Sequence, residues 1–349
     1  MSLNILNLKL SSKIMNDQYI ENCKLIKEHK INSKYEVLED YSGYQIESEL
    51  DRIFHFYTET LFLNEIYGIK PSILYFENSI YINAVASKQN DFYVVGIYLG
   101  TIGYLLKIFK DNKALIKNSG NEQYIEFEKN IGINLNELMY QQALHFTFYH
   151  EMAHLIQKSE FLELNLLENL TAEENFNFDK HIIEIDADIY ASLSIGSHVI
   201  QFAKDVFKEK LTDEQLEKIL VVICTSAFTY ILSLQKDNSN IYYKENSHPH
   251  PIIRITLIVL HIVSYVMEAL QSDGYNFNLT ASNIVNKCLS FSSQLPGEII
   301  NIDLINNYVA ILPHENANIS NYILEVQMHL DVLENSACKK WNEILGKEK

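Results

Sequence analysis

The sequence contains few of the residues that interrupt long helices, with 5 prolines and 11 glycines among 349 residues. Turn-rich β folds use both residue types heavily, so their scarcity favours long helices over tight-turn β-structure. The chain is long enough to bury a large core. Because we find no low-complexity segment, internal repeat or convincing linker, we treat residues 1–349 as a single domain. Residues 1–45 could be an N-terminal addition to it.

Cysteines are also few and far apart, at Cys23, Cys224, Cys288 and Cys338. The absence of a Cys-x-x-Cys pair excludes a zinc knuckle, and the wide spacing is unlike a disulfide framework. Four unpaired thiols suit a reducing compartment. Residues 1–14 lack the basic start and apolar block of a signal peptide. These features together predict a cytoplasmic protein.

Basic charge is scarce: 45 acidic residues against 28 basic residues give a net charge of −17. The resulting field repels phosphate backbones and anionic lipid headgroups, so nucleic acid is not an expected partner. The apolar run at residues 219–234 is 16 residues long, shorter than the roughly 18 that span a bilayer. We interpret it as a buried core helix, with a membrane-associated helix as the alternative. A membrane partner is not expected.

Short runs rich in β-branched and aromatic residues predict a small sheet early in the chain. They cover residues 73–76, 80–86 and 92–98, with turn-forming residues at 78–79 and 88–91 between them. We predict two or three antiparallel strands. An amphipathic helix at residues 46–67, closed by Gly68, precedes them.

Helical patterns dominate from about Asn136, the predicted N-cap of a helix that runs to Lys158. A second helical region follows at residues 178–210, with a possible break at Gly196, and a capping box at 212–215 opens a third helix. Pro249 and Pro251 open a fourth helix, and further helices lie on either side of Pro296 and Pro313. The predicted fold class is α+β and helix-dominated, with a small antiparallel sheet ahead of the helix at 136–158.

That helix carries the segment His150-Glu151-Met152-Ala153-His154. Histidines four residues apart lie on one helical face, so both imidazoles can reach one zinc ion. Glu151 would lie beside the metal, where it can take a proton from a zinc-bound water. The alternative is a helix that holds two partly buried histidines and no metal.

A catalytic zinc needs three protein ligands, and the next predicted helix offers carboxylates. Glu184 and Asp188 share one face of that helix. We assign Glu184 as the third ligand and Asp188 as the carboxylate behind His150 or His154, where it would fix the imidazole tautomer. Asp186, two residues from Glu184, should point elsewhere. A solvated acidic face is the alternative.

A third element is the segment from His248 to Ile255, at the start of a predicted helix. If a zinc-bound water attacks a substrate carbonyl, a hydrogen-bond donor is needed where that carbonyl oxygen becomes an oxyanion, and His248 or His250 could supply it. Arg254, one turn further on, could serve as an anchor or ion-pair partner. The alternative is that both histidines only begin the helix.

Taken together, these residues resemble the glutamate-zincin (gluzincin) pattern, His-Glu-x-x-His followed by Glu-x-x-Ala-Asp. More particularly, they are similar to the peptidases related to the CAAX prenyl endopeptidase and the HtpX heat-shock protease. Residues 83–86 with the strand at 94–97 resemble the Asn-Ala-Phe-Ala segment of that family and its following strand. Residues 248–255 resemble its His-Pro-x-x-x-x-Arg-Ile segment.

Some features depart from the family. Ala153 stands where the family usually has glycine before the second histidine, a small change that leaves the ligand geometry plausible. The transmembrane helices of the membrane-bound members are missing, so prenylated or membrane substrates are not implied. Residues 1–70 and 257–349 resemble nothing that we can name.

The resemblance implies a zincin-like catalytic core at residues 72–256. It implies zinc ligands at His150, His154 and Glu184, Glu151 as base and His248 near the oxyanion. It also implies that an edge strand at Asn83 and Ala84 holds an extended substrate. We therefore predict a soluble Zn²⁺-dependent endopeptidase that acts on a peptide or protein. The alternatives are a narrow-specificity intracellular protease of the phage-exclusion or stress-regulation type, and a non-catalytic zincin scaffold that binds or regulates.

Overall fold

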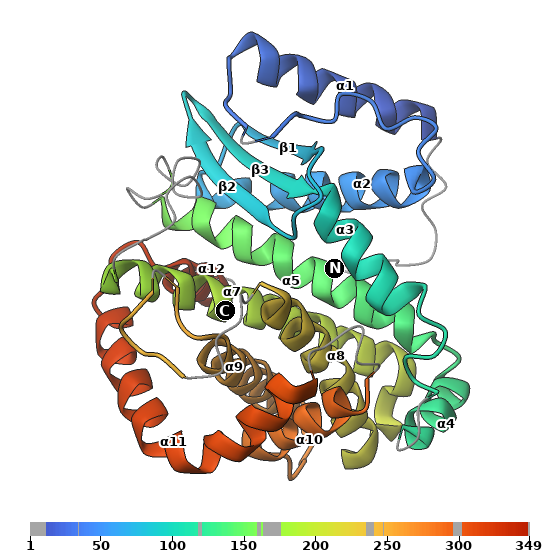
Figure 1. Ribbon diagram of the computed structural model, residues 1–349, viewed down its shortest axis with the longest axis vertical. Coiled ribbons are helices and arrows are strands. Elements are labelled where there is room, and N and C mark those ends of the chain that lie inside the picture. The colour runs from blue at the N-terminus through green and yellow to red at the C-terminus, as the bar shows by residue number, and fades with distance from the viewer. Residues whose placement is uncertain are drawn as a thin grey trace. The chain divides into compact units, whose positions relative to one another are not determined.

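The computed structural model describes residues 12–33, 35–117, 121–158, 162, 176–234, 241–246, 248–295 and 302–347. These residues form two compact units. The first contains the described residues up to 101 with residues 158 and 162, and the second contains the others. Helices dominate, and three strands form a small mixed sheet (Figure 1). The prediction of a helix-dominated chain with a small sheet is therefore confirmed. Whether residues 72–256 act as one catalytic core stays a prediction.

The first unit combines helices with the sheet. Its elements are α1 (Ser12–Glu28), α2 (Glu47–Leu63), a 3₁₀ turn (Asn64–Tyr67), β1 (Ser72–Glu77), β2 (Ala84–Gln89) and β3 (Phe92–Tyr98). The next helix, α3 (Leu99–Leu105), begins in this unit and ends in the second. Gly68 ends the helical segment with a φ of +70°, the left-handed conformation expected of a C-terminal cap. The prediction of a helix closed at this glycine is confirmed.

The sheet is mixed, so the prediction of purely antiparallel strands is wrong. Its strand order is β1-β3-β2, with β2 antiparallel and β1 parallel to the central β3. β2 and β3 form a hairpin around Asn90 and Asp91, with Asn90 at a φ of +54°. Residues 88 and 89, expected in the turn, continue the strand, because the half-buried side chains of an edge strand can be polar.

The parallel pairing arises because the chain between β1 and β2 crosses the end of β3. Residues 80–83, expected in the second strand, lie in this crossing segment. The segment passes directly over Gly100, whose backbone N–H donates to Ser79 O at 2.7 Å. A Cβ atom at Gly100 would lie 2.3 Å from Tyr81 O, so only glycine allows this approach.

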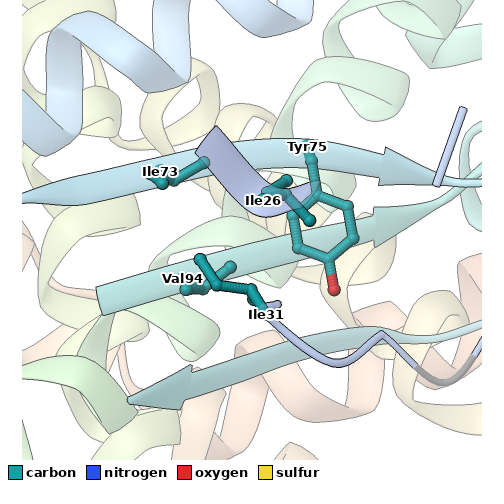
Figure 2. Packing of buried hydrophobic residues seen from close by; sticks show 5 residues of the cluster. All are labelled: Ile26, Ile31, Ile73, Tyr75 and Val94. Atoms are coloured by element: carbon teal, nitrogen blue, oxygen red, sulfur yellow. The ribbon is translucent and has the colours of Figure 1, made fainter. Parts of the chain in front are cut away.

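A compact cluster of apolar side chains joins α1 to the sheet. Figure 2 shows Ile26 of α1 and Ile31 beside Ile73 and Tyr75 of β1 and Val94 of β3. All five side chains are buried. Ile73 and Tyr75 are two residues apart, so they lie on the same face of β1 and cover it together.

The second unit is helical within its described residues. It contains a π-helical turn (Leu106–Lys110), α4 (Glu122–Ile131), α5 (Leu135–Gln157), α7 (Phe178–Phe207), a 3₁₀ turn (Lys208–Lys210), α8 (Asp213–Ser233), α9 (Pro251–Ser272), α10 (Ala281–Ser293), α11 (Ile302–Leu330) and α12 (Ala337–Lys347). α7 packs against α5, α9, α11 and α12 (Figure 1). This central position buries several faces of α7 at once.

Most predicted helix starts are confirmed, with one correction. Thr212 and Gln215 form the expected capping box at α8, and α9 begins at Pro251. The N-cap of α5 is Asn134 rather than Asn136, because the Asn134 side chain accepts from Glu137 N at 2.8 Å. Asn136 instead donates its side-chain amide to Phe109 O and Asn112 O, at and just after the end of the π-helical turn.

Two expected interruptions of helices do not occur. α7 continues through Gly196, where the absence of a side chain lets the Tyr265 ring approach closely. Pro313 lies inside α11 rather than at a helix boundary. Proline costs a helix one backbone hydrogen bond, which a long packed helix can tolerate. Pro296 lies outside the described residues.

Two helices, α8 and α9, are long and apolar enough to cross a membrane by length and composition. The apolar 18-residue stretch of α8 is 83% buried inside the protein, and the corresponding stretch of α9 is 56% buried. Core helices of soluble proteins pass the same test, so the finding is weak evidence for a membrane. The burial of residues 219–232 agrees with the interpretation of this run as a core helix.

Candidate metal centre

Helices α5 and α7 bring two imidazoles and one carboxylate together. His150 and His154 lie one turn apart on α5, with their Nε2 atoms 3.2 Å from each other. Glu184 on α7 faces both rings: its Oε2 is 3.4 Å from His150 Nε2, and its Oε1 is 3.5 Å from His154 Nε2. The three side chains are at most 15% exposed. The residues predicted as ligands therefore converge on one point.

The spacing of these donor atoms fits a zinc ion. Tetrahedral zinc with nitrogen and oxygen ligands at about 2.0–2.2 Å holds its donor atoms about 3.4 Å apart. The two Nε2 atoms are 3.2 Å apart, and each lies 3.4–3.5 Å from a different oxygen of Glu184. With one donor atom taken from each residue, the three atoms all lie within 4.8 Å of one another. Imidazole and carboxylate are donors that zinc accepts, and three protein ligands is the number found in catalytic zinc sites.

Asp188 supports His150 from behind. Its Oδ1 lies 2.9 Å from His150 Nδ1, the ring nitrogen that does not face the other candidate ligands. Arg254 of α9 binds both oxygens of Asp188, with Nε 2.7 Å from Oδ2 and Nη2 2.8 Å from Oδ1. Of the two histidines that the sequence left open, Asp188 therefore contacts His150. Of its two predicted roles, anchor or ion-pair partner, Arg254 therefore has that of ion-pair partner, to Asp188.

The packed charges determine the protonation of the cluster. Burial lowers the pKa of His150, but its contacts with Asp188 and Glu184 outweigh burial and raise that pKa to about 10. Burial, aided by the positive charge of His150, lowers the pKa of His154. The contacts of His150 therefore favour its protonated form and the surroundings of His154 favour its neutral form, so metal binding at His150 competes with a proton.

Glu151 follows the first of these histidines but is not among the clustered donors. Its side chain is buried, and burial raises the pKa of its carboxyl group to about 7, against the opposing charge of His150. A carboxyl group with a pKa near neutrality can accept a proton and give it back. This is the behaviour expected of a general base.

Gln157 supports His154 from behind and was not predicted. Its Oε1 lies 2.9 Å from His154 Nδ1. Its Nε2 donates to Ile183 O and to Asp186 Oδ2, each at 2.9 Å. The signal available in the sequence was a glutamine directly after the apolar pair Leu155 and Ile156, where only a hydrogen-bonded amide can be buried.

Asp186 is not among the clustered donors, as predicted, because its carboxylate is directed to Gln157, Ser336 and Ala337. Its side chain is 1% exposed and contacts Gln157. Because α7 is surrounded by other helices, a different face of α7 is buried as well.

The structure separates the two histidines that were candidates for the oxyanion. The His248 side chain is 54% exposed, and its Nε2 lies 3.5 Å from Glu184 Oε1. His250 is fully buried between Tyr242 and Tyr308, and its Nδ1 accepts from Ile252 N at the start of α9. His248 is therefore exposed beside the candidate ligands, whereas His250 caps a helix.

The buried His250 leads to a prediction about acid stability. Burial lowers its pKa to about 4, whereas an unfolded histidine has a pKa of about 6.5. Between these pH values the unfolded chain binds a proton that the folded protein excludes, so stability is lost as the pH falls from 6.5 towards 4. We expect His250→Asn, which keeps a helix cap, to reduce this loss by about 2–3 kcal/mol between pH 7 and 4.5. Urea unfolding at several pH values measures the free energy of unfolding of both proteins. An equal loss of stability between pH 7 and 4.5 in the parent protein and in His250→Asn would contradict the prediction.

The residues predicted to hold the substrate lie in the first unit. Ala84 begins β2, and Asn83 directly precedes it. Thr101 fixes Asn83, because its hydroxyl oxygen lies 2.7 Å from both the backbone N and the backbone O of Asn83. β2 is an edge strand of the sheet, as expected. Its role as a substrate strand stays a prediction.

Comparisons with models of protein families, with curated proteins and with solved structures found no match for this chain.

Proposed function

We propose that this chain is a zinc-dependent endopeptidase of the zincin type. The observation that carries the proposal is that one donor atom from each of His150, His154 and Glu184 lies within 4.8 Å of the others, with Glu151 next to the first of them in the sequence. Each histidine also has a polar partner at Nδ1, which leaves Nε2 for a metal ion. A pair of histidines that merely filled a core would not need a shared carboxylate in front and separate partners behind.

In this proposal, each residue of the site has a separate role in peptide hydrolysis. A bound zinc ion would supply Lewis acidity, which lowers the pKa of water and polarises the substrate carbonyl. Glu151 accepts a proton from the attacking water as the water oxygen bonds to the carbonyl carbon. Glu151 then gives this proton to the leaving nitrogen as the C–N bond breaks. One water molecule is consumed, and the products are a carboxylic acid and an amine.

His248 is the residue that we assign to the carbonyl oxygen of the substrate. It is exposed and lies at the edge of the candidate ligands, 3.5 Å from Glu184. An imidazole N–H at this point can donate to an oxygen that becomes negative during the reaction. Arg254 is bound at both oxygens of Asp188, so we assign it to holding Asp188 rather than to the substrate.

The substrate class in this proposal is a peptide or protein in an extended conformation. β2 has β3 on one side only, so its outer edge can pair with an added strand. The resemblance to the CAAX prenyl endopeptidase and HtpX peptidases belongs to the same proposal. It rests on the motif at 150–154, on Glu184 with Asp188, and on His248 with Arg254.

The test is the zinc content of the purified protein and of the variant Glu184→Ala. We expect near-stoichiometric zinc in the parent protein and its loss in the variant, because two imidazoles alone bind zinc weakly. The matched control is Asp205→Ala, since Asp205 is an exposed carboxylate on the same helix. Elemental analysis after dialysis without chelator measures the metal.

Two results would overturn the proposal. A parent protein that stays free of zinc after zinc is offered would leave a zincin-like scaffold used for binding. Equal zinc in the parent protein and in Glu184→Ala would remove Glu184 from the ligand set.

A further inference from the structure

Acceptors on two sides determine the orientation of the Gln157 side-chain amide. Its Nε2 lies 2.9 Å from Ile183 O and 2.9 Å from Asp186 Oδ2. A carbonyl oxygen and a carboxylate oxygen can only accept hydrogen bonds, so both must face the N–H groups of the amide. The amide oxygen must then face His154, and the alternative flipped amide is excluded.

This orientation selects one tautomer of His154. An amide oxygen only accepts, so His154 Nδ1, at 2.9 Å, must carry the hydrogen. The lone pair of the neutral ring then lies on Nε2, which points towards His150 Nε2 and Glu184. That is the tautomer able to bind a metal ion through Nε2.

Asp186 is in turn held by the start of α12. Its Oδ1 accepts from Ser336 Oγ at 2.6 Å, and its Oδ2 accepts from Ala337 N at 2.7 Å. Ser336 also caps α12 by accepting from Lys339 N at 3.1 Å. A buried carboxylate at a helix N-terminus is stabilised by the N–H groups and by the helix dipole. Asp186 is therefore held in position by the hydroxyl of Ser336 and the backbone N–H of Ala337.

We propose that Gln157 and Asp186 are positioning residues for the zinc site. In this arrangement the first turn of α12 orients Asp186, Asp186 orients Gln157, and Gln157 holds His154 in its metal-binding tautomer. Asp188 and Arg254 serve His150 in the corresponding way, so the two ligand histidines have separate supports. The inference rests on the proposed function for the metal, but the tautomer of His154 is a property of the metal-free protein.

The decisive variant is Gln157→Met, which keeps the length of the side chain and removes its hydrogen bonds. Loss of a hydrogen-bond partner behind a ligand histidine is expected to weaken zinc binding about 10- to 100-fold. The matched control is Lys340→Met, because Lys340 Nζ bonds Ile156 O at 2.5 Å and links α12 to α5 without touching Gln157. Zinc affinity is measured by competition with a chromophoric chelator, and folding is checked by circular dichroism in excess chelator.

A second measurement needs no substitution of Gln157 or Asp186. In metal-free parent protein labelled with ¹⁵N-histidine, long-range ¹H–¹⁵N spectra should show His154 as the Nδ1–H tautomer, with the signal assigned through His154→Gln. An Nε2–H tautomer would overturn the inference even if Gln157→Met failed to fold. Unchanged zinc affinity in folded Gln157→Met would also overturn it and leave the zinc site intact. A parent protein that binds no zinc would instead refute the proposed function.

Discussion

Replacing Glu151 with glutamine is expected to reduce peptide hydrolysis by a factor of about 10²–10⁴ while zinc stays bound. Glutamine has the shape of glutamate but cannot accept a proton, so the variant lacks the base that activates water. Glu151 is not one of the clustered donors, so the ligands His150, His154 and Glu184 keep their arrangement. Hydrolysis and metal content therefore respond differently to one substitution.

The measurement uses a broad mixture of unmodified peptides, because the structure does not name a substrate sequence. Mass spectrometry counts the new N-termini produced by the zinc-loaded protein and by Glu151→Gln. Glu137→Gln is the matched control, since Glu137 lies two turns or more before the motif on the same helix and pairs with Lys110. Undiminished cleavage by zinc-loaded Glu151→Gln would remove Glu151 from the role of base. Absence of cleavage by the zinc-loaded parent protein would favour a non-catalytic zincin scaffold.

The parts of the site that follow from helical spacing could be predicted from the sequence. His150 and His154 are one turn apart, and Glu184 and Asp188 are one turn apart, so each pair shares a helical face whatever surrounds it. The convergence of Glu184 on both imidazoles requires only that α5 and α7 pack with these faces together. Local periodicity and the known chemistry of ligands were sufficient for this step.

Features that depend on distant neighbours could not be predicted in the same way. The parallel pairing of β1 with β3 depends on a crossing segment that fits over Gly100, and strand propensity carries no information about partners. The contacts of Asp186 could not be predicted because its partners Ser336 and Ala337 are about 150 residues away in the sequence. Asn134 and Asn136 have the same capping propensity, and only the contact of Asn136 with Phe109 O, 27 residues earlier, decides between them.

Arg254→Met is expected to lower the free energy of unfolding of the metal-free protein by about 3–5 kcal/mol. Arg254 is 7% exposed and Asp188 is 1% exposed, and two hydrogen bonds of 2.7 and 2.8 Å join them. Glu184 Oε2 also lies 3.9 Å from Arg254 Nη2. Methionine fills similar space but leaves two buried carboxylates with one cation fewer, and a buried charge without a partner is strongly unfavourable. Urea unfolding in the presence of chelator measures the change without a contribution from metal.

Arg52, the other arginine in the sequence, provides the control for this prediction. It pairs with Glu49 at 2.7 Å, but its side chain is 39% exposed. An exposed ion pair contributes about 0–1 kcal/mol, so Arg52→Met should change stability far less. The double variant Arg254→Met/Asp188→Leu should recover part of the loss, because it removes a carboxylate that Arg254→Met leaves without its arginine. If Arg254→Met lowered the free energy of unfolding no more than Arg52→Met does, Arg254 would not be needed to stabilise the buried Asp188 carboxylate. The position of Asp188 beside His150 would then depend on its contact with the imidazole alone.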